Sequence, residues 1–245
     1  MTEIPSTLEQ AVEQAQTAVQ AAIADGYSRL QVELLFPELR VMPIAQQFIT
    51  PFESMGEDLR IFFPDPGSAA LARRDWGEKP FSMRGIGELK AKIQPQEKLF
   101  LFIEPSSIEV QQVEQLCEEA GDRPVVLFLP HLEDVAIVGI GYAARQLRER
   151  FLKQFESCYY LCPLEGAALL RCYPFPWQVW LETGEGNYEL IAEEPQRPSS
   201  ETLQEILMRA TGQTESSDNT APTPAKPTSP GILGGLKQFL RALNQ

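Results

Sequence analysis

The sequence predicts an α/β fold in which a mostly parallel five-stranded sheet is flanked by helices and followed by a C-terminal antiparallel hairpin. Five short apolar runs each end next to a proline, namely Pro37, Pro64, Pro105, Pro130 and Pro163. Proline cannot donate to a sheet ladder and disfavours helix at the residue before it, so each run is typical of a strand with a defined end. The prolines are 25 to 41 residues apart, which leaves room for a helix between strands. These intervals favour Rossmann-like parallel connections over hairpins.

Helices and strands alternate in the first half of the chain. Ser6 and Glu9 have the spacing of a capping box, and apolar residues follow at helical intervals until Gly26. This pattern predicts the first helix. Strands are then expected at 29–36, 59–63 and 98–103, and helices at 43–55 with a break near Pro51, at 69–74 and at 85–93.

The same alternation continues before it gives way to a hairpin. Ser106 and Glu109 repeat the capping-box spacing ahead of a helix that ends at Gly121. Strands are predicted at 124–129 and 157–162, on either side of a basic helix at 142–155. Two further strands at 171–180 and 188–192, joined by Gly184-Glu185-Gly186-Asn187, indicate a hairpin, and a last helix is expected at 200–210.

Composition divides the chain into three parts. Residues 1–212 are expected to form a single α/β domain, and residues 213–230, rich in Thr, Pro, Ser and Ala, a disordered linker. Residues 231–245 are expected to form an amphipathic helical tail that folds mainly when it docks. If this tail is helical, its apolar side chains lie within about 120° of arc. They are Ile232, Leu233, Leu236, Phe239, Leu240 and Leu243, and we expect them to bind a membrane or a partner.

Charge and cysteine content exclude several classes of function. The chain has 34 acidic and 21 basic residues, a net charge of −13, which disfavours binding to nucleic acid. The four cysteines form no Cys-x-x-Cys pair, so no metal site is expected, and no cofactor is predicted. No apolar run approaches the roughly 20 residues that span a bilayer, and the N-terminus lacks a leader pattern. We therefore expect a location on the cytoplasmic or stromal side.

One stretch at the predicted sheet edge is a candidate ligand site. Gly139-Ile140-Gly141-Tyr142-Ala143-Ala144 fits a loose dinucleotide pattern, and the basic residues after it could pair with an oxyanion. The tentative ligand-binding residues are His131, Gly139, Gly141, Arg145, Arg148 and Arg150. The alternatives are a glycine turn that enters a packed helix, and a solvated helix face paired with Glu149 and Glu156.

Other polar and aromatic motifs have structural explanations that compete with functional ones. His131 follows the fourth strand, where an α/β protein would place a general base, but a polar cap explains it equally well, and no catalytic residue is predicted. Asp65-Pro66-Gly67-Ser68 predicts a tight turn more strongly than a phosphate cradle. The segment Tyr173 to Trp177 is either an aromatic docking surface or a cover for the sheet. Four acids near strand ends suit either Mg²⁺ or helix capping: Asp65, Glu104, Glu133 and Asp134.

A series of short motifs supports a family resemblance over nearly all of residues 5–210. The motifs are Phe63-Pro64-Asp65, Ala69-Ala70-Leu71-Ala72 with Trp76, Val125-Val126-Leu127, Arg148 to Phe151, Tyr159-Tyr160-Leu161, and Tyr173-Pro174 to Trp177. In this order they resemble domain-of-unknown-function family 1995 of cyanobacteria and chloroplasts. The resemblance implies a photosynthetic setting, because one plant relative, the low photosystem II accumulation protein, is an assembly factor. Another copy of the domain is joined to a chloroplast adenylate kinase, but this chain lacks the kinase glycine-rich loop and its lysine.

These observations predict a non-enzymatic auxiliary or assembly factor for photosynthetic membrane complexes, peripheral to the thylakoid membrane. Its expected partner is such a complex or an assembly intermediate, reached through the C-terminal amphipathic helix. The alternative is a small-molecule or nucleotide-binding α/β domain, with or without enzymatic activity. That alternative predicts a concave pocket, lined by polar groups, between the strand ends and residues 145–150.

Overall fold

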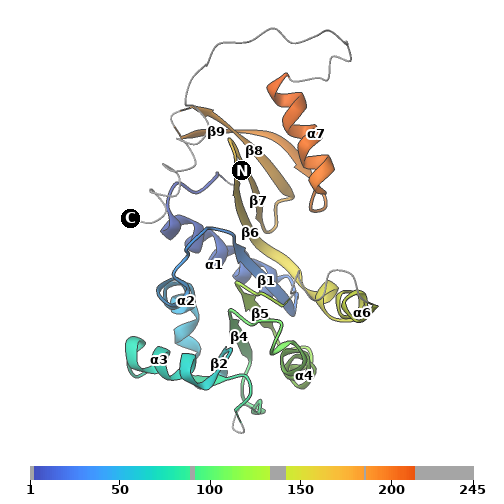
Figure 1. Ribbon diagram of the computed structural model, residues 1–245. Coiled ribbons are helices and arrows are strands. Elements are labelled where there is room, and N and C mark those ends of the chain that lie inside the picture. The colour runs from blue at the N-terminus through green and yellow to red at the C-terminus, as the bar shows by residue number, and fades with distance from the viewer. Residues whose placement is uncertain (1–2, 89–91, 133–141, 185, 213–245) are drawn as a thin grey trace.

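A single sheet organises the protein. The computed structural model describes residues 3–88, 92–132, 142–184 and 186–212, and within these segments nine strands join in the order β3-β2-β4-β5-β1-β6-β7-β8-β9 (Figure 1). The predicted linker and amphipathic tail lie outside the described residues. The α/β class, the mostly parallel sheet and the C-terminal hairpin are therefore confirmed, whereas the predicted number of five sheet strands is wrong.

The sheet has a parallel and an antiparallel part. The first six strands in this order pair in parallel: β3 (Ser82–Gly85), β2 (Leu59–Phe63), β4 (Leu99–Ile103), β5 (Val125–Phe128), β1 (Arg29–Leu34) and β6 (Glu156–Leu164). The rest pair antiparallel: β7 (Ala167–Cys172), β8 (Trp177–Gly184) and β9 (Asn187–Glu194). The long strand β6 links the two parts, because β1 borders one side of it and β7 the other.

The sequence prediction missed β3 and merged β7 with β8. β3 is the four-residue segment Ser-Met-Arg-Gly, and the expected helix at 85–93 is instead the end of this strand followed by a turn at Ile86 and Gly87. The expected strand at 171–180 is two strands, β7 and β8, because the chain turns at residues 173–176. A short polar strand is stabilised by its ladder partners, which local composition does not reveal.

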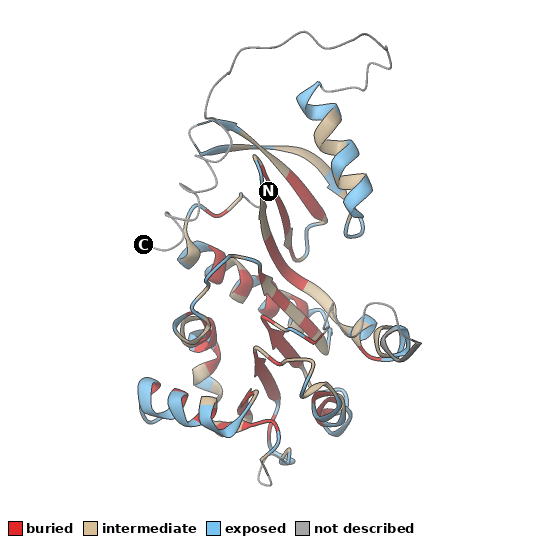
Figure 2. Ribbon diagram, in the orientation of Figure 1, coloured by how far each residue is buried: buried red, intermediate tan, exposed pale blue. Residues whose placement is uncertain are grey.

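Helices cover both faces of the parallel part. α1 (Leu8–Ala24), α2 (Val41–Ile49) with the 3-10 helix η1 (Thr50–Asp58), and α3 (Pro66–Trp76) enclose the larger core. α4 (Val110–Ala120) and α6 (Tyr142–Arg150), which continues through Phe151 into the 3-10 helix η2 (Leu152–Gln154), enclose a second core on the other face. α7 (Ser200–Thr211) packs on the antiparallel strands (Figures 1 and 2). Every residue of β2, β4 and β5 is buried as a result.

Both helix starts predicted from capping boxes are shifted. α1 begins at Leu8, with the Thr7 side chain accepting a hydrogen bond from the backbone of Gln10 at 3.2 Å. Glu109 accepts a hydrogen bond from the backbone of Ser106 at 3.1 Å, but this pair closes a turn ahead of α4, which begins at Val110. Thr7 is thus the N-cap of α1 in place of Ser6, and the Ser106 and Glu109 pair lies ahead of α4 without capping it.

Asp65 caps α3, and its removal should weaken the fold in a pH-dependent way. Its carboxylate accepts hydrogen bonds from the backbone of Gly67 at 2.7 Å and Ser68 at 3.0 Å. The Ser68 hydroxyl and backbone, together with the Gly67 backbone, hold the pKa of this carboxyl below its ordinary value of 3.8, although burial opposes them. We expect Asp65→Ala to cost about 1 kcal/mol at pH 7. Chemical denaturation measures this loss.

The sign of the pH effect follows from the lowered pKa. The capping carboxylate contributes stability above its unfolded pKa, and that contribution disappears as the pH falls through the folded pKa. The difference between the wild-type protein and Asp65→Ala should therefore shrink below about pH 4. Asp65→Asn, which keeps a capping oxygen, serves as the control and should lose less stability at pH 7. A difference that grows with acidity would contradict this explanation.

Candidate functional site

The central strand β1 is polar on one face. Leu30, Val32 and Leu34 are buried in the core that α1 covers, while Gln31 and Glu33 on the opposite face are only half-buried. On that face the neighbouring strand β5 is covered by α4 and α6. Within the described segments, α4 and α6 therefore cover β5 on this face, and β1 presents a polar strip beside it.

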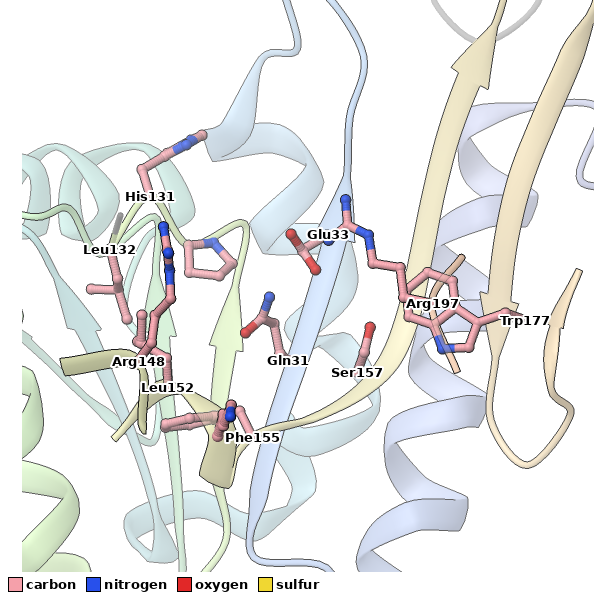
Figure 3. Close-up of a pocket in the computed structure, with 12 residues that line it drawn as sticks. Gln31, Glu33, His131, Leu132, Arg148, Leu152, Phe155, Ser157, Trp177 and Arg197 are labelled. Carbon is pink, nitrogen blue, oxygen red and sulfur yellow. The ribbon is translucent and has the colours of Figure 1, made fainter. Parts of the chain in front are cut away.

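A groove of about 690 Å³ lies over this strip (Figure 3). Gln31 and Glu33 from β1 and Ser157 from β6 form its floor, and their side chains point into the same space. One wall contains Arg148, Leu152, Lys153 and Phe155 of the α6 and η2 region, and the other contains Trp177 and Arg197. Pro130 and His131, which follow β5, close its rim at the carboxyl ends of the strands. Parallel sheets commonly bind ligands at this edge.

Arg197 forms the second wall together with two aromatic rings. Its guanidinium lies 4.4 Å from the centroid of the Tyr160 ring and 5.8 Å from that of Trp177, and it donates a hydrogen bond of 2.6 Å to the Tyr160 hydroxyl. Burial raises the pKa of the Tyr160 phenol, and the Glu33 carboxylate raises it further, although Arg197 lowers it. Tyr160 therefore stays protonated at neutral pH, and the Arg197 guanidinium lies over its ring at this wall.

The structure separates the predicted cluster of basic residues. Arg148 lines the groove, whereas Arg145 is exposed outside it and Arg150 forms an ion pair of 2.8 Å with Glu114 on α4. Lys153 lines the groove and pairs with Glu149 at 2.6 Å. The expected pairing of this cluster with Glu149 is thus found.

Glu156, the second expected partner of the basic cluster, forms an ion pair within the sheet. The Glu156 carboxylate lies 2.9 Å from the guanidinium of Arg171 on β7, the strand next to its own. This carboxylate therefore takes part in cross-strand pairing within the sheet.

The remaining predicted site residues that the structure describes lie apart from one another. His131 is exposed at the groove rim, with its Nε2 atom 3.7 Å from the Glu104 carboxylate. Asp65 caps α3, so its own carboxylate occupies the helix end where a phosphate would bind. Gly139, Gly141, Glu133 and Asp134 lie outside the described residues. Within the described segments, no group of three or more His, Cys, Asp or Glu side chains could hold a metal ion.

A smaller depression adjoins the groove at the strand ends. It has a volume of about 260 Å³ and is lined mainly by apolar residues of 34–41 and by Leu129. Leu129 and Glu104 directly follow β5 and β4, and both have positive φ angles, 53° and 50°. This conformation is unusual for residues other than glycine and is often found near functional sites. Glu33, Pro130 and His131 line both depressions, so the two hollows meet at the rim.

Sequence reasoning identified Arg148 and His131 but missed the floor of the groove. The alternation of apolar and polar residues at 29–34 was the available signal, since a strand covered on both faces would be continuously apolar. The predicted aromatic surface is also divided, because Trp177 is only 7% exposed while Phe175 is exposed. Arg197 gave no local signal, because its contacts with Tyr160 and Trp177 depend on the order of the strands.

Comparison with known families identifies the chain. A family model described as "Domain of unknown function (DUF1995)" matches residues 5–205. The chain belongs to this family. The DUF1995 match spans the whole sheet and every residue of the groove. No solved structure matches the chain significantly. In the described part of this DUF1995 protein, every helix is too short or too polar to cross a bilayer.

Proposed function

We propose that this DUF1995 protein is a non-enzymatic auxiliary factor that helps to assemble or maintain photosynthetic membrane complexes. The observation that carries the proposal is the family match over residues 5–205, because the resemblance to this family implies a photosynthetic setting. In this proposal the α/β body binds the complex or an assembly intermediate. The C-terminal tail attaches the protein reversibly to a thylakoid membrane or to a partner.

The tail pattern supports weak and reversible attachment. Burial of half of its apolar surface would contribute several kcal/mol to binding. Lys237 and Arg241 add little electrostatic attraction, while residues 1–212 carry 32 acidic and 18 basic side chains, a net charge of −14. This negative body is repelled by anionic lipid, so apolar burial has to dominate the attachment.

Removing the tail should abolish attachment to membranes. In flotation with liposomes of mixed neutral and anionic lipid, we expect the full chain to float and a chain that ends at Thr211 to remain at the bottom. The physical reason is the loss of the apolar face that lies at Leu236, Phe239 and Leu240 if the tail is helical. Flotation scored by immunoblotting measures the result.

A matched pair of tail variants tests the cause. Phe239→Asp and Gln238→Asp change the charge equally, but only Phe239 belongs to the predicted apolar face. Phe239→Asp should behave like the truncated chain and Gln238→Asp like the full chain. Equal flotation of the full and truncated chains would rule out the tail as the membrane anchor. Pull-down with the tail alone would then test a protein groove as its binding site, since an amphipathic helix suits both.

A second candidate function is a small-molecule or nucleotide-binding α/β domain with or without enzymatic activity. The groove over β1 and β6 favours it, because a concave site lined by polar groups at the carboxyl edge of the sheet is what this alternative requires. Saturable changes in the amide signals of Gln31 and Ser157 on addition of a small molecule would support it.

A further inference from the structure

The smaller depression at the strand ends has an apolar lining that the described segments leave open. The exposed side chain of Leu35 and the half-buried side chains of Leu39 and Val41 line it. Leu35 is 42% exposed, although it directly follows the central strand β1. The volume of about 260 Å³ lies below the range of about 300–1,000 Å³ that is typical of small-molecule sites. The depression therefore suits the apolar side chains of a peptide better than a whole small molecule.

The rim of this depression is acidic and has an unusual backbone. Glu38 is exposed, and the side chain of Glu104 is 43% exposed beside His131. Among the described residues, positive φ angles outside glycine occur at Glu38 (60°), Glu104 (50°) and Leu129 (53°), and all three line the depression. Such sparsely populated conformations cluster at binding sites. Two of these three residues hold carboxylates at the edge of the apolar hollow.

The C-terminal tail has the complementary pattern. If residues 231–245 are helical, Leu236, Phe239 and Leu240 lie on the apolar face. The two basic side chains of the tail, Lys237 and Arg241, are four residues apart and lie along one flank of that face. Amphipathic helices of this kind bind grooves through apolar side chains at spacings of three and four residues. Both the apolar and the basic parts of the tail thus have a counterpart in the depression.

The segment before the tail is long enough to bring it to this edge of the sheet. A chain as long as residues 213–230 spans up to about 60 Å when extended, whereas a compact domain the size of residues 1–212 has a radius of gyration of about 17 Å. The 32 acidic and 18 basic side chains of residues 1–212 also favour the approach of a tail with two positive charges. Because the tail is tethered, its effective concentration is in the millimolar range, so a weak contact is enough for docking.

We propose that the smaller depression is the docking site of the chain's own C-terminal helix. The apolar face of the helix covers Leu35, Leu39 and Val41, and its two basic side chains lie against Glu38 and Glu104. This inference goes beyond both proposed functions, because it gives the tail a binding site within the same chain. A membrane or a partner then has to compete with the body of the protein for the apolar face of the tail.

Nuclear magnetic resonance spectra of the full chain without lipid test the docking. The amides of Leu35 and Leu39 report on the depression. Phe239→Asp should shift both signals, because it places a charge on the apolar face of the tail. Gln238→Asp makes the same change of charge outside that face and should leave them unchanged. The wild-type signals should also be unchanged by about tenfold dilution, since the tail docks on its own body.

A matched pair of exposed leucines locates the docking site. Leu35 lines the depression, whereas Leu71 on α3 is 46% exposed and lies outside it. A peptide with the sequence of residues 231–245 is titrated into the full chain that carries Phe239→Asp, whose own tail no longer competes. Leu35→Asp on this background should weaken peptide binding by about tenfold or more, Glu38→Gln should weaken it by about threefold, and Leu71→Asp should leave it unchanged.

Three outcomes would overturn the inference. If Phe239→Asp shifts the amides of the depression no more than Gln238→Asp does, the tail does not dock there. Wild-type signals that move toward those of Phe239→Asp on dilution would show that the tail comes from a second copy of the chain. Equal weakening of peptide binding by Leu35→Asp and Leu71→Asp would show nonspecific apolar attraction. None of these measurements contains lipid, so their outcome is independent of the membrane attachment that flotation tests.

Discussion

Glutamine in place of Glu97 should lower the free energy of unfolding by about 3–5 kcal/mol. The Glu97 carboxylate accepts a hydrogen bond of 2.6 Å from Nε of Arg60, and the side chains of the two residues are only 3% and 6% exposed. Its other oxygen accepts a hydrogen bond of 2.8 Å from the backbone of Gln94. Glu97→Gln preserves the shape of the side chain but leaves a buried guanidinium without its carboxylate. Urea denaturation measures the loss.

An exposed ion pair in the same region provides the control. Lys98 and Asp58 lie 2.6 Å apart, but the lysine side chain is mostly in solvent. Asp58→Asn should therefore cost less than about 1 kcal/mol. Replacing Arg60 and Glu97 together with Met and Leu should recover much of the loss, because an apolar pair needs no charge compensation. If Glu97→Gln is no more harmful than Asp58→Asn, the buried pair does not stabilise the fold as proposed.

The sequence predicted strands best where burial is complete. β4 and β5 are continuously apolar, β2 is apolar except for Arg60, and all three are buried at every position, so composition identifies them. β3 and β7 depend on their neighbours instead. Among the described residues, β3 pairs with β2 alone at the edge of the sheet, and β7 lies in antiparallel ladders between β6 and β8. Such ladders join residues across the fold, and single-sequence periodicity does not contain that information.

The candidate site shows the same division between local and non-local information. Arg148 could be selected because it belongs to a local basic run after a predicted strand. Arg197 could not be selected from the sequence, because its contacts with Tyr160 and Trp177 join a loop near α7 to two strands of the sheet. Gln31 and Ser157 lie in adjacent strands, β1 and β6, although more than 100 residues separate them. Strand order is thus what assembles the groove.

Alanine in place of Gly85 should destabilise the protein by about 1–3 kcal/mol. Gly85 ends the edge strand β3, where the backbone passes against the first turn of α3. A Cβ atom at this position would lie 2.6 Å from the backbone nitrogen of Pro66 and 2.7 Å from the carbonyl carbon of Asp65. Neither contact involves a flexible side chain, so the strand or the helix start has to move. Chemical denaturation measures the cost.

Gly87 offers a matched control two residues away. A Cβ atom at Gly87 would have no neighbouring atom within 4 Å, so Gly87→Ala should change stability by no more than about 0.5 kcal/mol. Hydrogen exchange adds a local measurement, because the Ile86 amide donates to the Phe63 carbonyl at 2.8 Å and holds the end of β3 on β2. Gly85→Ala should accelerate exchange at this amide, whereas Gly87→Ala should not. Equal effects of the two substitutions would contradict the explanation that position 85 requires glycine because the backbone lies so close to α3.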